Sequence, residues 1–435
     1  MGKRVRRSSV CPKHQRDKHL EDRISQLPDG ILSHILSLLK IREAGRSSVL
    51  SCRWRDLWKF TTSLNFDASE TILKLFGRKI KQERSKYVAW VNQVLKLHLR
   101  PSLDEFRVSF FLDSRDSCII DEWINFVIPK RVKILEIDLQ PFSLATLYTP
   151  SQECYLSFKS PSNLSSIKCL TSLSLQYVNV NGELIEYFLS NCPHLEQLRL
   201  FWLEQIVNLN VSGPALQLKH LEIYRCKLLE SLEFCAPKLV TFKYFGHTKI
   251  RLSMGNLPLL AELDISASQD HQATYALVPF SSYLSKIETL KLDLWLPEDY
   301  EEIPQIPELT KLKHLTLDVE GLPCSRFPWF TSLLEAAPSL LSFKLSSPIG
   351  SRAILPQMLT PHPHECLKDV EIFGFVNRKL VMYLLQNAIN LEKITIDPYH
   401  PSDRSGKYRK SKKKQEARAH QLREELPFGF KITVL

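Results

Sequence analysis

One spacing of apolar side chains occurs in four consecutive segments, residues 195–200 (LEQLRL), 218–223 (LKHLEI), 239–244 (LVTFKY) and 260–265 (LAELDI). In each segment the first, fourth and sixth residues are apolar or aromatic, and the fifth is charged. On an extended strand the fourth and sixth side chains share one face, and the fifth points the opposite way. Each segment therefore predicts a short strand with one buried and one solvated face.

The same spacing occurs twelve times along the 435-residue chain. Successive copies begin 21 to 38 residues apart. Most of these intervals lie in the range of roughly 20–29 residues that is typical of leucine-rich repeats. The pattern therefore predicts a stack of parallel strands, and its copies are Leu103/Phe106/Val108, Val132/Leu135/Ile137, Leu170/Leu173/Leu175, Leu195/Leu198/Leu200, Leu218/Leu221/Ile223, Leu239/Phe242/Tyr244, Leu260/Leu263/Ile265, Ile287/Leu290/Leu292, Leu312/Leu315/Leu317, Leu340/Phe343/Leu345, Leu367/Val370/Ile372 and Leu391/Ile394/Ile396.

The chain segments between the strands contain helix-like returns. Two of them, Gly182–Ser190 and Trp329–Ala336, end just before a proline, which stops a helix and leads into the next strand. This pattern predicts an α/β solenoid in which helical or irregular returns connect the strands.

The fifth position of every repeat is polar, which a stacked sheet with one solvated face requires. The residue after the sixth position is also expected to point outward, and in three successive repeats it is aromatic. We therefore predict an aromatic ridge with a charged rim that binds a target protein, formed by Arg199, Phe201, Glu222, Tyr224, Lys243 and Phe245. Two alternatives remain open, namely that the strands end one residue earlier or that a neighbouring loop covers the rings. Trp202 and Trp295 are weaker candidates.

Residues 22–58 have a different, helical period. Ile31, Leu32, Ile35, Leu36 and Leu39 form one apolar stripe of an amphipathic helix, and a second stripe contains Leu50, Trp54, Leu57 and Trp58. Fewer than 40 residues cannot build a large independent core. This segment must therefore pack against something else.

The formal net charge of +11 is confined to the ends of the chain. Residues 1–20 carry +6 and residues 404–418 carry +7, so the other 400 residues sum to −2. The part of the chain between these ends is therefore nearly neutral and lacks the contiguous basic face with which proteins bind the phosphate backbone. Nucleic-acid binding is not expected. No apolar run reaches the length of a membrane span, and none of the ten cysteines forms a C-x-x-C pair.

No catalytic or nucleotide-binding motif stands out in the sequence. The one ligand-like cluster is His362, His364, Glu365 and Cys366, which two prolines interrupt just before a predicted strand. We interpret it as a loop that enters the strand, because a zinc site needs further ligands nearby. We therefore expect a non-catalytic chain without a metal or cofactor.

The sequence DRISQLPDGILSHILSLLKIREAGRSSVLSCRWRDLW at residues 22–58 closely resembles an F-box, and the remainder of the chain is similar to the plant F-box/leucine-rich-repeat/FBD family. The resemblance implies an α/β fold in which a three-helix F-box precedes an irregular repeat solenoid and an FBD-like end. The implied divisions are a basic disordered flank (1–20), the F-box (21–62), a helical connector (63–102), leucine-rich repeats (103–365) and FBD-like C-terminal repeats (366–435) with a basic loop (404–418).

The resemblance also implies a function. An F-box binds a Skp1-like adaptor that links to a cullin-RING ubiquitin ligase, and the repeats bind a target protein that the sequence does not identify. The docking positions implied by analogy are Leu27, Pro28, Ile31, Leu32, Ile35, Leu36, Val49, Trp54, Leu57 and Trp58. The chain departs from the family at Lys40, where the family usually has proline, and at Gly45, where it usually has a branched apolar residue.

Three alternatives to this interpretation remain. The front helices could simply cap the first repeat, since terminal repeats need covering. The chain could be a nuclear repeat scaffold with a non-functional F-box, or a nucleic-acid-associated protein that uses its basic ends. The segment 404–418 is either a nuclear localisation signal or a solvated loop, so we expect residence in the nucleus, the cytoplasm or both.

Overall fold

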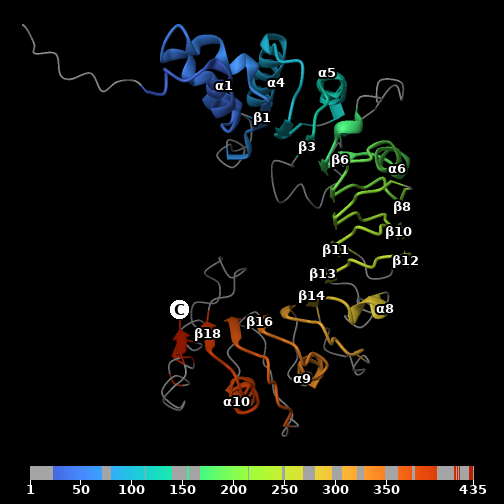
Figure 1. The fold of residues 1–435 in the computed structure, drawn as a ribbon. Coiled ribbons are helices and arrows are strands. Elements are labelled where there is room, and N and C mark those ends of the chain that lie inside the picture. Colours follow the sequence, from blue (N-terminus) through green and yellow to red (C-terminus); the bar gives the residue numbers. More distant parts are fainter. Residues whose placement is uncertain are drawn as a thin grey trace, which may run out of the picture.

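One parallel sheet runs through the molecule from the N-terminal end to the C-terminal end and curves into an arc (Figure 1). The computed structural model describes residues 23–70, 80–112, 114–139, 154–155, 167–213, 215–246, 250–267, 280–295, 306–320, 328–347, 361–374, 378–398, 416–417, 419, 421 and 431–434. The flank 1–20 and all of 404–418 except Glu416 and Ala417 lie outside these residues.

The strands of this sheet lie in the order of the chain, and each pairs in parallel with its neighbours. The strands are β1 (Ser63–Asp67), β2 (Glu105–Ser109), β3 (Ile134–Asp138), β5 (Ser172–Gln176), β7 (Gln197–Phe201), β9 (His220–Tyr224), β11 (Thr241–Gly246), β13 (Glu262–Ala267), β14 (Thr289–Trp295), β15 (His314–Glu320), β16 (Ser342–Ser347), β17 (Asp369–Gly374), β18 (Lys393–Asp397) and β19 (Lys431–Val434).

All twelve predicted strands are confirmed, and the repeat pattern also sets their register. Leu198 pairs with Leu221, Leu221 with Phe242, and Phe242 with Leu263, so equivalent repeat positions lie side by side. Every apolar position of the twelve repeats is buried, and the most exposed of them, Leu391, is only 7% exposed. These side chains fill the space behind the sheet and form the core of the solenoid.

Strand β1 lies within 63–102, which we predicted to be a helical connector, so that prediction is wrong for its first residues. The repeat pattern misses this strand because Thr61 occupies the first apolar position. Thr61 is fully buried, and its hydroxyl donates to the Trp58 carbonyl oxygen at 2.9 Å. The rest of the connector contains the expected helix, α4 (Ile80–Leu97).

The outer side of the arc carries most of the helices beyond the F-box (Figure 1). These elements are α5 (Ser117–Val127), α6 (Gly182–Asn191), α8 (Ser281–Leu284), α9 (Pro328–Glu335), α10 (Arg378–Asn387) and the short 3₁₀ helices η4 (Ser114–Asp116) and η5 (Ile128–Lys130). The two predicted helical returns are confirmed as α6 and α9. The opposite, concave side of the arc is therefore the solvated face of the sheet.

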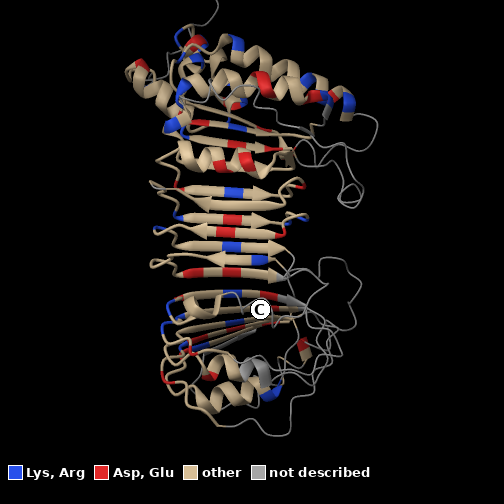
Figure 2. Ribbon diagram, turned by 90° about the vertical axis from the view of Figure 1, so that its right-hand side faces the viewer, with Lys and Arg blue, Asp and Glu red and all other residues tan. Residues whose placement is uncertain are grey.

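The middle of the outer side, where we expected helical or irregular returns, is covered by strands (Figure 2). Strands β8 (Asn208–Ser212), β10 (Ser231–Cys235) and β12 (Arg251–Met254) form a second parallel sheet. The repeats here begin only 21–23 residues apart, which leaves little room for a helix between strands. A separate pair joins β4 (Cys154–Tyr155) to β6 (Val178–Asn179).

Helix α6 closes one edge of this second sheet. The Asn181 side chain caps the helix by accepting a hydrogen bond from the Leu184 N–H at 3.1 Å. Gly182 is required at the next position, because a Cβ there would clash with the Asn208 carbonyl oxygen. The backbone N–H of Asn210 also donates to the Glu186 carboxylate at 2.8 Å.

The N-terminal module comprises α1 (Asp29–Ser37), α2 (Ile41–Arg46) and the 3₁₀ helices η1 (Ser47–Val49) and η2 (Trp54–Phe60). Its buried side chains and those of the repeats belong to one continuous hydrophobic core. The module and the solenoid therefore form a single packed unit. Among the described residues, no helix combines the length and apolar character of a transmembrane segment.

Candidate protein-binding surfaces

Helix α1 of the N-terminal module has two apolar rows that face different surroundings. Leu32 and Leu36 lie four residues apart and are 0% and 2% exposed. Ile31 and Ile35, also four residues apart, are 49% and 37% exposed. Adjacent residues of a helix point about 100° apart, so one row enters the core and the other faces solvent.

Four of the predicted docking residues are not available on the surface. Leu32, Leu36, Trp54 and Leu57 are buried inside the chain itself, so they belong to its core and not to an exposed face, and their role in docking stays a prediction. The sequence pattern merged two rows of one helix into a single stripe. Trp54 is also held from within, because its indole N–H donates to the Ser25 hydroxyl at 2.9 Å.

The remaining predicted docking residues stay accessible to different degrees. Pro28, Ile31, Ile35 and Val49 are exposed, whereas Leu27 and Trp58 are half-buried against the core. Val49 reaches 87% exposure. The structure adds further exposed apolar residues in the same module that our docking set did not include, namely Ile24, Leu38, Leu39, Leu50 and Phe60.

Polar contacts fix the module to the first repeat. The Lys40 ammonium lies 3.0 Å from the Asp67 carboxylate at the end of β1. Their hydrogen bond raises the pKa of Lys40 above its usual value. In addition, the Arg42 guanidinium lies 5.0 Å from the centre of the Trp90 ring on α4, and the Thr62 N–H donates to the Ser37 hydroxyl at 2.8 Å.

The two departures from the F-box pattern have a structural account. Lys40 precedes α2 with φ of −58°, which is the value a proline would impose, and its side chain gains the contact with Asp67. Gly45 lies within α2, and a Cβ built there would meet nothing within 4 Å. The missing branched side chain therefore leaves no internal cavity among the described residues.

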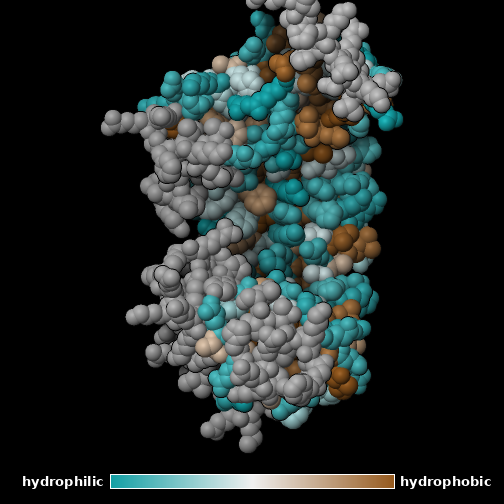
Figure 3. All heavy atoms as spheres, turned by 90° about the vertical axis from the view of Figure 1, so that its left-hand side faces the viewer, coloured by the Kyte–Doolittle hydropathy of each residue, from teal (hydrophilic) through white to brown (hydrophobic). Residues whose placement is uncertain are grey.

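The concave face of the solenoid carries charged side chains of alternating sign. The outward residues of neighbouring strands form ion pairs, Arg107–Glu136 at 2.9 Å, Arg199–Glu222 at 3.6 Å, Lys243–Glu222 at 3.6 Å, Lys291–Asp264 at 3.2 Å and Lys344–Glu371 at 3.3 Å. Figure 3 looks onto this side, where the described surface of the repeats is mainly hydrophilic and hydrophobic atoms gather near the top. This face has no continuous basic stripe over its described residues.

The predicted aromatic ridge is present as a row of rings. Phe201 pairs with Tyr224 in the sheet and Tyr224 with Phe245. All three residues lie within their strands, so the alternative that the strands end one residue earlier is wrong. The ring centres are 5.7 Å apart for Phe201 and Tyr224, and 4.4 Å apart for Tyr224 and Phe245.

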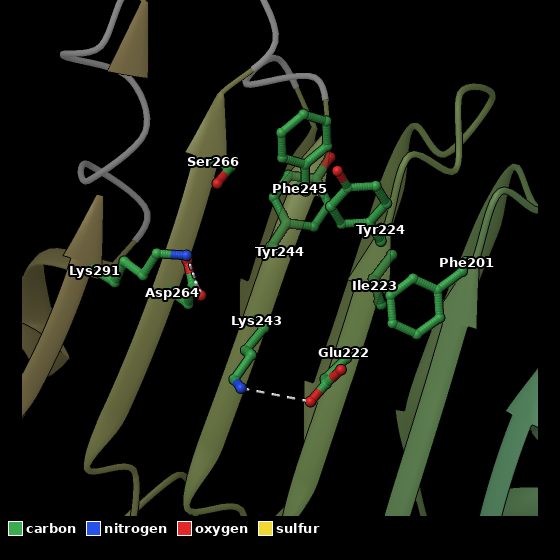
Figure 4. Close-up of a pocket in the computed structure, with 10 residues that line it drawn as sticks. All are labelled: Phe201, Glu222, Ile223, Tyr224, Lys243, Tyr244, Phe245, Asp264, Ser266 and Lys291. Atoms are coloured by element: carbon green, nitrogen blue, oxygen red, sulfur yellow. Dashed lines mark hydrogen bonds and ion pairs between the residues drawn. The ribbon is translucent and has the colours of Figure 1, made fainter. Parts of the chain in front are cut away.

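A shallow hollow of about 110 Å³ lies on the concave face beside these rings (Figure 4). Its wall combines the three rings with Glu222, Lys243, Asp264 and Lys291. The six predicted target-binding residues therefore lie together, since Arg199 pairs with Glu222 at its edge. Their role in binding a target remains a prediction.

A second row of side chains lies next to the ridge, and sequence reasoning largely missed it. Tyr177, Trp202 and Arg225 each come directly after a strand in a left-handed backbone conformation. We had named only Trp202, because the sequence does not show that three successive strands end in the same turn. Trp295 lies in β14, but its side chain is outside the described structure.

The histidine cluster holds a loop in place. His364 is 5% exposed, and its Nε2 atom lies 3.1 Å from the Tyr383 hydroxyl on α10. The backbone N–H groups of His362 and His364 donate to the side chain and the backbone of Asn387. No group of three metal-binding side chains occurs among the described residues.

Comparison with known proteins agrees with this architecture. A family model described as the At1g61320/AtMIF1 LRR domain matches residues 94–426, and the F-box domain model matches residues 24–63. The FBD-associated F-box protein At1g66310 of Arabidopsis thaliana is 25% identical over 422 residues, which cover 88% of this chain and 92% of that protein.

Two further relatives from Arabidopsis thaliana have names that combine an F-box with leucine-rich repeats. The F-box/FBD/LRR-repeat protein At1g78750 is 26% identical over 86% of this chain and 89% of its own length. The F-box/LRR-repeat protein At3g03360 is 32% identical over 60% of this chain and 55% of its own length. With an F-box, a repeat domain that spans most of the sequence and relatives of this kind, the chain belongs to the plant F-box/LRR-repeat proteins of the FBD type.

Proposed function

We propose that this chain is the substrate-recognition subunit of a Skp1-cullin-F-box ubiquitin ligase. Proteins of the F-box/LRR family are in general non-catalytic adaptors, and an F-box in general binds a Skp1-type partner. The observation that carries the proposal is the division of α1 into a buried row and an exposed row. The F-box is anchored by one row and still presents apolar side chains with the other.

The exposed row has enough apolar surface for a protein interface. Complete burial of a large apolar side chain contributes roughly 1.5–3 kcal/mol. In this chain Ile31 is 49% exposed, Ile35 is 37% exposed and Val49 is 87% exposed. A partner that covered them could therefore gain between about a third and most of this burial energy from each side chain. Together with the neighbouring exposed residues, this gain is of the size needed to offset the cost of association.

The repeat face supplies a surface for the protein to be modified. The hollow beside the aromatic ridge is about 110 Å³, whereas sites for drug-sized molecules enclose about 300–1,000 Å³. Its size therefore suits one side chain of a protein partner. Aromatic rings surrounded by charges of both signs are typical of the anchors of protein interfaces.

In this function the chain contributes position and no reacting group. A lysine of the bound target would attack a ubiquitin thioester carried by a separate conjugating enzyme. Holding the two together raises their effective concentration, which accelerates the transfer without an acid, base or nucleophile from this chain.

The proposal is tested by co-expressing the full chain with a Skp1-like adaptor and purifying the pair. The Ile35→Glu variant should lose the adaptor, because a carboxylate would be buried in an apolar interface. Leu228→Glu is the matched control, since Leu228 is 55% exposed and lies in the repeats. Retention of the adaptor by Ile35→Glu at the level of the control would show that α1 is not the docking element.

A further inference from the structure

We propose that Arg225, held between aromatic rings at the end of β9, binds an acidic group of the target protein, either a carboxylate or a phosphate. This inference rests on the proposed function, because it specifies the chemistry of the target that the concave face receives.

The backbone directs three side chains onto the end of the aromatic ridge. Tyr177, Trp202 and Arg225 have φ values of 54°, 56° and 53°. Each donates its backbone N–H to the carbonyl oxygen at the end of the next strand, at 3.0, 2.8 and 2.6 Å. Glycine and asparagine tolerate this left-handed conformation best, and bulky residues there are uncommon. Strained positions of this kind concentrate at functional sites.

The three side chains and the ridge form one continuous stack. The rings of Tyr177 and Trp202 lie 5.3 Å apart and nearly parallel, at 17°. The Arg225 guanidinium is 4.8 Å from the centre of the Trp202 ring and 4.7 Å from the centre of the Phe245 ring. Rings on two sides restrict the guanidinium to few orientations, so its donors are organised before a ligand arrives.

Within the described structure, the charge of Arg225 meets aromatic faces but no carboxylate. The half-buried guanidinium forms no ion pair with a described carboxylate, and its Nε atom is buried without a hydrogen-bond partner. By contrast, nearby Lys227 pairs with Glu204 at 3.3 Å, and Arg199 and Lys243 share Glu222. A buried donor without a partner is costly, so this arginine lacks, among the residues that the structure describes, the polar contacts that usually fix a structural one.

The surrounding charge favours an anion. Arg199, Lys243 and Lys291 lie in or beside the hollow with the carboxylates of Glu222 and Asp264, and Arg225 adds a fourth cation next to Phe245, so cations outnumber carboxylates here. Arginine forms paired hydrogen bonds with carboxylate and phosphate groups, because both present oxygens that match its planar fork. The hollow beside Phe245 accepts an apolar side chain, so the expected target segment carries an acidic residue next to an apolar one.

The probes for this proposal are three pools of fluorescent peptides with random flanks. Each pool carries a fixed Phe followed by Asp, by phosphoserine or by Asn, and is incubated with the immobilised full-length chain. We expect the Asp or phosphoserine pool to be retained at least fivefold more than the Asn pool. Selective retention of phosphoserine alone identifies a phosphate reader, and equal retention of both acidic pools identifies a general reader of acidic residues.

Variants assign the binding to Arg225. Arg225→Gln should abolish the preference for the acidic pools, Arg225→Lys should keep part of it, and Lys227→Gln should leave it unchanged. Thermal melting checks that all variants fold. Equal retention of the three pools, no retention of any pool, or an unchanged preference in folded Arg225→Gln would overturn the proposal. Adaptor co-purification is scored separately, so failure of the F-box to bind remains distinguishable from failure of this site.

Discussion

Adjacent residues of α1 should respond in opposite ways to the same truncation. Leu32 is fully buried in the shared core, so Leu32→Ala leaves a cavity and should destabilise the N-terminal end by about 2–5 kcal/mol. Ile31 is 49% exposed, so Ile31→Ala removes little internal packing. Alanine also favours the helix by a few tenths of a kcal/mol. The stability change for Ile31→Ala should therefore be close to zero.

The direct effects on adaptor affinity should be the reverse: Ile31→Ala should weaken binding, and Leu32→Ala should not. About half of the Ile31 side chain remains to be buried by a partner, which corresponds to about 1 kcal/mol and about fivefold in Kd. Leu32 lies inside the chain, so Leu32→Ala should weaken binding only through unfolding of the module.

Two measurements separate these effects. Hydrogen exchange of the α1 amides reports local stability, which suits a repeat protein whose end can open separately. Titration with a Skp1-like adaptor gives the affinity of each variant. The reasoning is refuted if Ile31→Ala accelerates exchange as much as Leu32→Ala, or if Ile31→Ala binds the adaptor with unchanged affinity.

Four further substitutions test stability. Gly45→Ala should stabilise the chain by about 0.5–1 kcal/mol in thermal melts, because the new Cβ meets open space, whereas Gly182→Ala should destabilise it through a clash with the Asn208 carbonyl oxygen. Lys40→Pro should fold normally by circular dichroism, since φ is already −58°, and loss of the α-helical signal would contradict this account. Burial lowers the pKa of His364 to about 4, below the unfolded value of about 6.5, so its stabilising contribution is complete above pH 6.5 and decreases as the pH falls toward 4. His364→Gln should flatten that part of the melting-temperature profile, and an equally steep profile in the variant would exclude His364 as its cause.

The sequence predicted the solenoid well because its pattern is repeated and strictly spaced. Twelve strands are predicted by apolar residues that each repeat places at the same offsets. Strand β1 was missed because Thr61 replaces an apolar residue and satisfies its hydroxyl locally. The outer strands β8, β10 and β12 were missed because a return too short for a helix can be a strand or an irregular segment. The sequence of these returns does not distinguish the two.

The binding surfaces were predicted only in part. The apolar pattern of α1 shows that Ile31 and Leu32 both need a partner, but it does not show which residue turns inward. That choice depends on how the helix packs against the rest of the module and the first repeat. The ridge of Phe201, Tyr224 and Phe245 was predicted from strand alternation, whereas Arg225 depends on a left-handed turn that no local pattern predicts.

The shared core of the F-box and the repeats has a geometric consequence. Five strand steps separate β1 from β9, and neighbouring strands lie about 4.8 Å apart, so the ridge stands about 24 Å along the sheet from the F-box. Because no flexible joint interrupts the described packing between them, the number of intervening repeats sets this separation. Under the proposed function, insertion of one repeat would move a bound target by about 5 Å relative to the ligase, so repeat number would select which lysines reach the thioester.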